Sequence, residues 1–266
     1  MQRFVIRSIV YCLIIIMIFS FVSCNFLKKS STLHPFAKVV NGKRVYGYIN
    51  NSGQEIIPAK YEMAYHFKDG LARIKINNAY GFINANDDLI GDKLFRFADD
   101  FSEGLALFEM NERFGFLNTS VEIAIKAKYR NARSFSEGKA AVRDKETWMF
   151  IDKNDNKLFD LDYGNPWSLR IGDFKEGYAI IGNDTDFNFF NTQGKRVFNT
   201  MYPTFGAGSS GFSEGLAAVN IDKKFGYINT EGKVVINPQF DYALPFVNGF
   251  APVRINNLWG FIKNDG

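Results

Sequence analysis

The sequence repeats with a period of 34 residues, and this period restricts the possible fold more than any other feature. An aromatic residue, a glycine, a second aromatic residue and an aliphatic residue recur at Tyr46–Ile49, Tyr80–Ile83, Phe114–Leu117, Phe225–Ile228 and Trp259–Ile262. A second motif, Phe-x-x-Gly, keeps the same phase at Phe67–Gly70, Phe101–Gly104, Phe135–Gly138, Phe174–Gly177, Phe212–Gly215 and Phe246–Gly249. A period of this length indicates stacked structural repeats, and such a sequence describes a scaffold more clearly than an activity.

One repeat reads as three short strands. Leu216–Ile221 alternates like a strand with one buried face, and Phe225–Ile228 is the returning strand. Asn229–Gly232 has the residues of a type I turn, which predicts a third strand at Lys233–Ile236 that ends at Asn237-Pro238.

The recurring residues have structural explanations. The glycine between the aromatic residues allows a neighbouring backbone to approach, and the Ser-Glu-Gly glycine fits a positive φ. The Phe of each Phe-x-x-Gly motif should pack against a neighbouring repeat. The motif's glutamates recur in the same environment, whereas an acid/base pair needs two different environments in one cleft. We therefore expect a structural role for them, the capping of local backbone N–H groups. These glutamates are Glu103, Glu137, Glu176 and Glu214.

The predicted fold is all-β, with tandem ~34-residue repeats of short antiparallel strands and hairpins. Phe36–Val40 aligns with the first strand of a repeat, which gives seven strand pairs. An open, curved, solenoid-like array is favoured, because ~34 residues is short for a four-stranded propeller blade. The alternative is a closed seven-bladed propeller.

The motifs resemble those of bacterial WG repeats. Tyr46–Gly70 and Phe225–Gly249 match best, and the resemblance covers about Phe36 to Gly266. Only Trp259-Gly260 keeps the Trp-Gly pair of the family name, and Tyr or Phe replaces the Trp elsewhere. The resemblance implies a repeat fold and little about mechanism.

The first residues have the form of a secretory signal peptide. Arg3 and Arg7 precede the apolar stretch Ile9–Val22, and Ser23-Cys24 follows. This resembles a bacterial lipoprotein signal, although Phe21 stands where that pattern usually has Leu. We therefore expect a signal peptide at 1–23, a lipidated Cys24 with a tether at 24–35, and a repeat domain at 36–266. The alternative, an uncleaved membrane anchor, is disfavoured by the short apolar stretch.

Charge and composition exclude several function classes. The net charge of +4 falls to +2 without Arg3 and Arg7, so no basic face for nucleic acid is expected. Loss of Cys12 with the signal leaves Cys24 as the only cysteine. His34 and His66 are the only histidines, and no nucleophile elbow, phosphate loop or zinc motif occurs. The sequence thus predicts no cofactor, no metal and no catalytic residue.

The repeat pattern is irregular in one region. The motif spacing lengthens to 39 residues from Trp148 to Phe187 and to 38 from Phe187 to Phe225. Insertions in repeat proteins often line one binding face, and aromatic residues there suit sugar rings or a partner protein. The candidate binding face comprises Tyr163, Trp167, Tyr202 and Phe205. The alternative is tolerated drift, with these side chains packed on the local core.

The same region is acidic. Ten acidic and five basic residues lie between Asp144 and Asp186. Asp152-x-Asn154-x-Asn156 copies the start of a calcium loop, but Lys157 and Tyr163 replace the required Gly and Glu, so no metal site is predicted.

These observations favour an exported, non-catalytic scaffold, lipid-anchored in the bacterial cell envelope at the outer membrane or cell surface. Its partners would be the membrane, through the lipid anchor, and an envelope protein or a cell-wall glycan. One alternative is a structural spacer or assembly protein without a small ligand. The other is a hydrolase with paired carboxylates in the irregular repeats.

Overall fold

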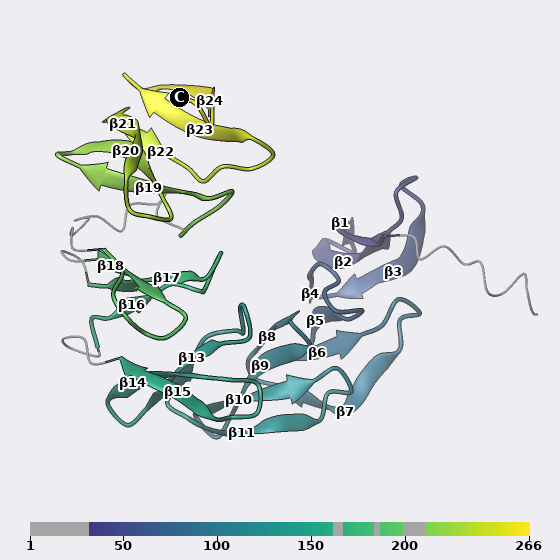
Figure 1. Ribbon diagram of the computed structural model, residues 1–266. Helices are drawn as coiled ribbons and strands as arrows, with labels where there is room; N and C mark the ends of the chain where they lie inside the picture. The colour runs from purple at the N-terminus through teal and green to yellow at the C-terminus, as the bar shows by residue number, and fades with distance from the viewer. Residues whose placement is uncertain (1–31, 162–166, 184–186, 199–210) are drawn as a thin grey trace, which may run out of the picture. The chain divides into compact units, whose positions relative to one another are not determined.

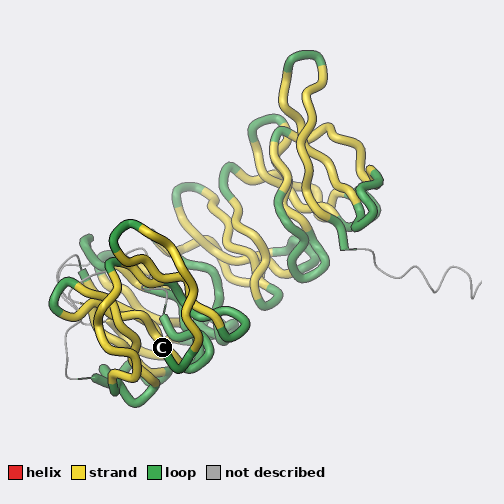
Figure 2. The backbone as a smooth tube through the Cα atoms, turned by 90° about the horizontal axis from the view of Figure 1, so that it is seen from above, coloured by secondary structure: helices red, strands yellow, loops and turns green. Residues whose placement is uncertain are grey.

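The computed structural model describes residues 32–161, 167–183, 187–198 and 211–266. The described residues form two compact units, which divide between Phe67 and Lys68. The described residues lie in strands, turns and loops, as Figure 2 shows by colour. Within them, no helix could span a membrane.

The first unit contains one antiparallel sheet in the order β1-β2-β3, followed by a two-residue strand. Its strands are β1 (His34–Val40), β2 (Lys43–Ile49), β3 (Glu55–Tyr61) and β4 (Met63–Ala64). The side chain of Tyr48 is fully buried there, and its ring packs edge-on against Phe67 with 5.0 Å between centroids.

The second unit repeats the same arrangement, with each sheet built from strands that follow one another in the sequence (Figure 1). The strands of its first half are β5 (Ala72–Ile76), β6 (Ala79–Ile83), β7 (Leu89–Phe95), β8 (Ala98–Ser102), β9 (Leu105–Met110), β10 (Arg113–Asn118), β11 (Ile123–Tyr129), β12 (Asn131–Ala132), β13 (Ala140–Asp144), β14 (Thr147–Ile151) and β15 (Lys157–Leu161). Those of its second half are β16 (Arg170–Ile171), β17 (Tyr178–Gly182), β18 (Phe187–Asn191), β19 (Leu216–Ile221), β20 (Lys224–Asn229), β21 (Val234–Phe240), β22 (Tyr242–Ala243), β23 (Phe250–Ile255) and β24 (Leu258–Lys263).

These sheets confirm the predicted all-β fold of tandem antiparallel strands. The turn between the second and third strands is also as predicted. The N–H of Gly232 donates to the Asn229 carbonyl at 2.9 Å, which closes the type I turn. The Asn229 side-chain oxygen accepts the N–H groups of Glu231 and Lys233, and Asn50, Asn84, Asn118 and Asn191 do the same in their own turns.

The predicted end of the third strand was wrong. β21 does not stop at Asn237-Pro238 but continues to Phe240. Its register against β20 shifts between Phe225 and Tyr227, so the strand passes a bulge at this point. Proline is tolerated at a bulge or on an edge strand because no ladder bond is needed from its nitrogen. The longer strand brings Phe240 opposite Phe225.

The two aromatic motifs meet in the core. The Phe of each Phe-x-x-Gly motif packs against the second aromatic residue of the preceding hairpin. The ring centroids lie 4.8–5.1 Å apart in the second unit, at Phe82–Phe101, Phe116–Phe135, Phe150–Phe174, Phe189–Phe212 and Tyr227–Phe246. All five motif phenylalanines are at most 1% exposed. Each repeat therefore contributes the ring that completes its predecessor's core.

The glycine between the aromatic residues allows the third strand to approach. A Cβ atom at Gly226 would lie 2.5 Å from the carbonyl oxygen of Ile236, and one at Gly115 would lie 2.5 Å from that of Ile125. These distances are too short for any side chain. The predicted close approach of a neighbouring backbone is confirmed at these positions.

The Ser-Glu-Gly motif forms a two-residue hairpin turn. In Ser136–Lys139 both central residues have positive φ, 49° at Glu137 and 73° at Gly138, which is the type I′ geometry. The prediction that the glutamate caps local N–H groups is wrong. Its carboxylate accepts an N–H group of the next repeat instead. The same carboxylate-to-glycine bond joins Asp69 to Gly104, Glu103 to Gly138, Glu137 to Gly177, Glu176 to Gly215, and Glu214 to Gly249.

Candidate functional site

The predicted binding face falls mostly outside the described residues. Tyr163, Tyr202 and Phe205 lie in segments that the structure does not describe, as does the predicted lipidation site Cys24. Trp167 is described, and 62% of its surface is exposed. Within the described residues, the predicted binding face is represented by Trp167 and its neighbours.

Trp167 lies against a buried arginine. Its ring centroid is 4.1 Å from the guanidinium carbon of Arg143, and the ring of Trp148 lies 5.8 Å from the same atom. Arg143 on β13 is directly opposite Trp148 on β14, which fixes this pair across the hairpin. The guanidinium is thus held by two indole rings, a favourable arrangement for a planar cation.

Arg143 is buried with one polar atom unsatisfied. Only 9% of the residue is exposed, and its Nε has no hydrogen-bond partner among the residues that the structure describes. The contact with Trp167 also shows that this indole is partly engaged by the protein itself. The remaining exposed surface of Trp167 is what could meet a ligand.

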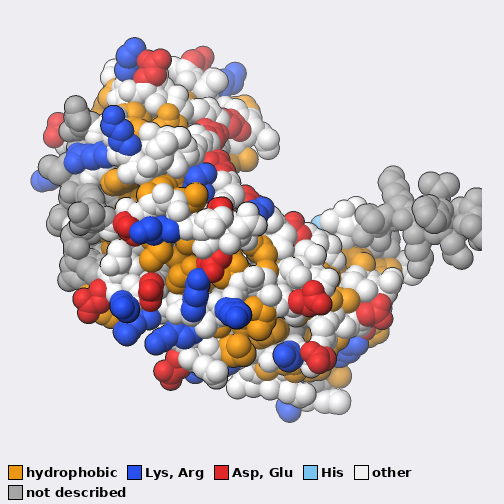
Figure 3. Space-filling view, turned by 60° about the horizontal axis from the view of Figure 1, so that its bottom comes forward, with side chains coloured by type: hydrophobic (Ala, Val, Ile, Leu, Met, Phe, Trp, Pro, Cys, Tyr) orange, Lys and Arg blue, Asp and Glu red, His pale blue; other side chains and the backbone are white. Residues whose placement is uncertain are grey.

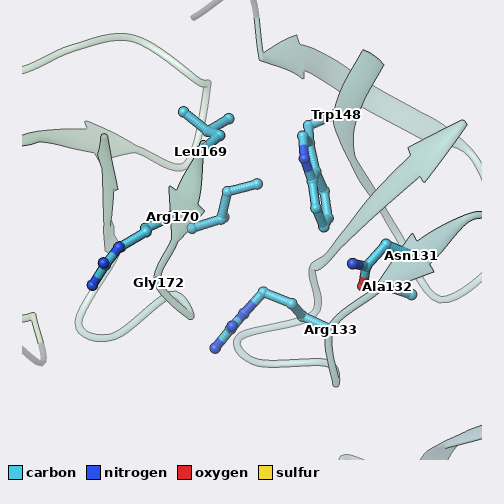
Figure 4. Close-up of a pocket in the computed structure, with 8 residues that line it drawn as sticks. Asn131, Ala132, Arg133, Trp148, Leu169, Arg170 and Gly172 are labelled. Carbon is cyan, nitrogen blue, oxygen red and sulfur yellow. The ribbon is translucent and has the colours of Figure 1, made fainter. Parts of the chain in front are cut away.

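A pocket of about 480 Å³ lies beside Trp148. It is lined by Asn131, Ala132, Arg133, Trp148, Leu169, Arg170, Ile171 and Gly172. Figure 4 shows Trp148 across the space from Leu169 and Arg170, with Arg133 reaching in from the strand end next to Asn131 and Ala132. The residues come from β12, β14 and β16 and from loop residues next to β12 and β16, so the pocket lies between the sheets of two successive repeats.

The lining combines one aromatic side chain with guanidinium and amide groups. Arg133 makes an ion pair with Asp173, with 2.9 Å between Nη2 and Oδ1. This pair orients the Arg133 head group near the pocket. An indole wall with nearby guanidinium donors can bind a sugar ring or a planar group and hydrogen-bond to carboxylate or hydroxyl oxygens.

Asp152, in the acidic region, has structural partners. Asp152 Oδ1 accepts the N–H groups of Asn154 and Asn156, and the side-chain amide of Asn156 donates to Asp152 Oδ2. The side-chain bond from Asn156 is the main cause that lowers the pKa of Asp152. Asp152 therefore begins the same turn that Asn229 begins elsewhere. Within the described residues, no three His, Cys, Asp or Glu side chains are grouped as metal ligands.

Charged side chains of both signs share one face of the molecule (Figure 3). On the face shown in Figure 3, Lys and Arg side chains lie among Asp and Glu side chains, without a large area of one sign. This distribution suits neutral or weakly charged ligands better than a polyanion, which requires a concentrated basic face.

Sequence reasoning missed most residues of the pocket. Arg133, Trp148 and Arg170 lie far apart in the repeat pattern, and no motif links them. One signal was present: Arg143 and Trp148 face each other across a hairpin, as Arg254 and Trp259 do in the last repeat. A cationic residue opposite tryptophan on one face of a hairpin predicts their contact.

The WG containing repeat family matches residues 46–78, 80–113, 114–148 and 225–259, which together exceed half of the chain. The chain belongs to the WG containing repeat family. The matched segments leave out residues 149–224, and the pocket lies at the boundary between the regular WG repeats and this irregular part.

The fold also resembles solved structures at low sequence identity. BamB from Moraxella catarrhalis aligns over 85% of this chain and 79% of its own, with 9% identity and a TM-score of 0.51. A structure described as the eukaryotic initiation factor aligns over 84% of this chain and 67% of its own, with 10% identity and a TM-score of 0.52. Such identities show a shared fold alone. No curated protein sequence matches the chain.

Proposed function

We propose that this WG repeat chain is an exported, lipid-anchored, non-catalytic scaffold that binds a ligand of the bacterial cell envelope. The signal-like residues 1–23 and Cys24 support export and anchoring, because a basic start, an apolar stretch and a small residue before cysteine occur in order. The stacked repeats support a scaffold, since repeat arrays serve as extended binding surfaces.

The pocket beside Trp148 is the single observation that carries the binding role. Its volume of about 480 Å³ suits a ligand of one or two sugar rings, because small-molecule pockets span about 300–1,000 Å³. Trp148 supplies a flat apolar wall, and Arg133 supplies donors for acidic or hydroxyl oxygens, whereas the guanidinium of Arg170 points away from Trp148 (Figure 4). We therefore favour a cell-wall glycan with acidic groups over an envelope protein.

The rival functions are less well supported. All the side chains that line the pocket are aliphatic, indole, amide or guanidinium groups, which suits binding rather than carboxylate catalysis. Asp152 and Asp173, which lie in the acidic region, serve a turn and an ion pair. A spacer role requires no pocket at this position.

A titration of the purified chain with soluble, acidic peptidoglycan fragments tests the proposal. We expect binding by calorimetry, weakened about tenfold by Arg133→Gln, because one charge-assisted bond is lost. Lys233→Gln is the matched control, because this exposed lysine pairs with nearby Glu231 in the turn before β21. Equal affinity of all three proteins would place the glycan elsewhere. Capture of an envelope protein, with no fragment binding, would favour the protein ligand.

A further inference from the structure

Two neighbouring positions of the repeat carry an ion pair in the sheet β8–β11. Arg96, before β8, binds the carboxylate of Glu109 on β9 through two nitrogen atoms. The Nε–Oε2 distance is 3.2 Å, and the Nη2–Oε1 distance is 2.8 Å. The Glu109 side chain is only 9% exposed. This buried carboxylate is therefore compensated by a guanidinium within the same repeat.

The equivalent positions next to the sheet β12–β15 lack a carboxylate. They hold Arg130 and Arg143, 34 residues after the ion pair. The Arg130 N–H donates to the Arg143 carbonyl oxygen at 2.8 Å. In the last repeat, Asp241 and Arg254 make the same backbone bond at 2.8 Å. Two repeats therefore place opposite charges at these positions, whereas this repeat places two positive charges there.

Arg143 is a buried cation without a counterion. The residue is 9% exposed, and its Nε has no hydrogen-bond partner in the part of the chain that the structure describes. Over the same residues, neither Arg130 nor Arg143 makes an ion pair. The indole rings of Trp148 and Trp167 cover the Arg143 guanidinium but carry no negative charge. A bound anion would therefore compensate a charge that is costly to bury alone.

The two arginines lie beside the pocket that carries the proposed glycan binding. Arg143 is directly opposite both Asn131 on β12 and Trp148 on β14. Directly opposite residues of neighbouring strands share one face of a sheet. Because Asn131 and Trp148 both line the pocket, Arg143 lies between two of its lining residues. Arg130 directly precedes Asn131 in the chain. An acidic group on a ligand in the pocket would thus lie next to both arginines.

We propose, building on the proposed glycan binding, that Arg130 and Arg143 form a carboxylate-binding site for a sugar acid in the adjacent pocket. The ligand carboxylate takes the place that the Glu109 carboxylate has in the preceding repeat. A carboxylate fits this place better than a phosphate or a sulfate, because it is the group that the protein itself puts there. Its planar shape also matches the guanidinium fork.

The test compares glucuronate with its neutral amide, glucuronamide, on the full chain. Saturation-transfer NMR titrations should give about tenfold higher affinity for glucuronate, because only the acid completes the ion pairs. Arg143→Gln should reduce this preference to about twofold or less. Arg96→Gln is the matched control, since it removes the same charge from the position equivalent to Arg130. We expect it to leave the preference unchanged.

Arg130→Glu tests the same site from its exposed residue, and it remains informative if Arg143→Gln does not fold. The new carboxylate supplies the missing counterion of Arg143 from within the protein. The thermal midpoint should therefore rise by about 2–4 °C. The preference for glucuronate should disappear in the same variant, because the place of the ligand carboxylate is taken.

Three results would overturn the proposal. One is equal affinity of the original chain for glucuronate and glucuronamide, or no binding of either. Another is a glucuronate preference that persists in folded Arg143→Gln or in Arg130→Glu. The third is acetate binding as tight as that of glucuronate, which would assign the site to any carboxylate, including an acidic side chain of a partner protein.

Failure of this site is distinguishable from failure of the glycan proposal. The peptidoglycan titration uses other ligands and Arg133→Gln, so those fragments can fail to bind while the preference for glucuronate holds. Conversely, the fragments can bind while acid and amide are bound equally. In that case the pocket would bind glycans without reading a carboxylate through Arg130 and Arg143.

Discussion

The carboxylate of Glu137 accepts a hydrogen bond from the backbone N–H of Gly177, 2.9 Å away, and so joins the turns of two successive repeats. The serine of the same motif adds a second link, because Ser136 Oγ donates to the carbonyl oxygen of Phe174 at 2.7 Å. Ser102 and Ser213 make the same bond to Phe135 and Phe246. One short motif therefore supplies the turn, the core ring and the polar contacts between repeats.

Removal of this link should destabilise the second unit. We expect Glu137→Ala to lower the free energy of unfolding by about 1 kcal/mol, the value of a partly exposed charge-assisted bond. Urea denaturation followed by circular dichroism measures it. Glu231→Ala is the control, because this exposed glutamate pairs with Lys233 within a single turn and does not link two repeats in the described part of the chain. Equal midpoints for both variants would show that this carboxylate-to-glycine bond between repeats adds no stability.

A motif glycine that lies against a neighbouring backbone and one that does not should respond differently to the same substitution. Gly226→Ala should cost about 2–3 kcal/mol, because the new Cβ overlaps the backbone of β21 and forces a shift. Gly260→Ala should change stability by less than about 0.5 kcal/mol, because its site is open. Thermal melts of both variants provide the comparison. A similar loss for both would mean that glycine is needed in the strand for another reason.

The sequence predicted those features that depend on one residue in a repeated environment. The positive φ of Gly138 and the close approach at Gly226 follow from glycine at a fixed position in the repeat. The target of Glu137 was not predictable, because a period gives the spacing of repeats but not which turn a long side chain reaches. Its partner Gly177 is 40 residues away, in the next repeat.

The candidate site was less predictable than the fold. Trp167 was identified from its insertion, yet its contact with Arg143 was not, because no motif places the two residues together. Arg133 reaches the pocket from a loop after β12 and carries no sequence signal of its own. This pocket between two repeats is lined by residues that occupy different positions within their repeats. An alignment of the repeats does not bring such residues together.

Val121 is a strained residue in an otherwise regular turn. Its φ of 60° lies in the left-handed region, where equivalent turns have Gly53, Gly194 or Gly232. A left-handed conformation costs an L-residue about 1–2 kcal/mol, whereas a half-buried Val side chain contributes about 0.7 kcal/mol. Val121→Asn should therefore stabilise the protein by about 0.5–1 kcal/mol in urea denaturation.

The reverse substitution at Gly53 is the matched experiment. No atom lies within 4 Å of a Cβ at Gly53, so Gly53→Val adds strain without a clash. It should destabilise the protein by about 1–2 kcal/mol. A loss of stability in Val121→Asn would mean that the packing of Val121 against its apolar neighbours outweighs its strain.

Tyr227 should make the protein sensitive to alkali. Burial raises the pKa of Tyr227, whose hydroxyl donates to the Leu244 carbonyl oxygen at 2.8 Å. The unfolded tyrosine has a pKa of about 10, so the unfolded chain releases its proton first. This contribution to stability is therefore complete below about pH 10 and is lost as the pH rises further.

Tyr227→Phe separates the hydrogen bond of the hydroxyl from its titration at high pH. At neutral pH it should cost about 1–2 kcal/mol, because a buried carbonyl loses its donor. Between about pH 9 and 11 its urea midpoint should fall less steeply than that of the original chain. Parallel curves would show that Tyr227 does not govern the alkaline loss. Tyr129, whose pKa is raised by burial and by its bond to Asp155, accounts for a remaining slope in the variant.

The anchoring proposal depends on Cys24, which lies outside the described residues. In a bacterial host, the full chain should incorporate radiolabelled palmitate and remain with the membrane fraction. Cys24→Ala should abolish labelling, because the thiol is the only acceptor after residues 1–23 are removed. Lys29→Ala, a change in the same tether, should label normally. Membrane retention of an unlabelled Cys24→Ala protein, still carrying residues 1–23, would show instead that Ile9–Val22 stays as an uncleaved anchor.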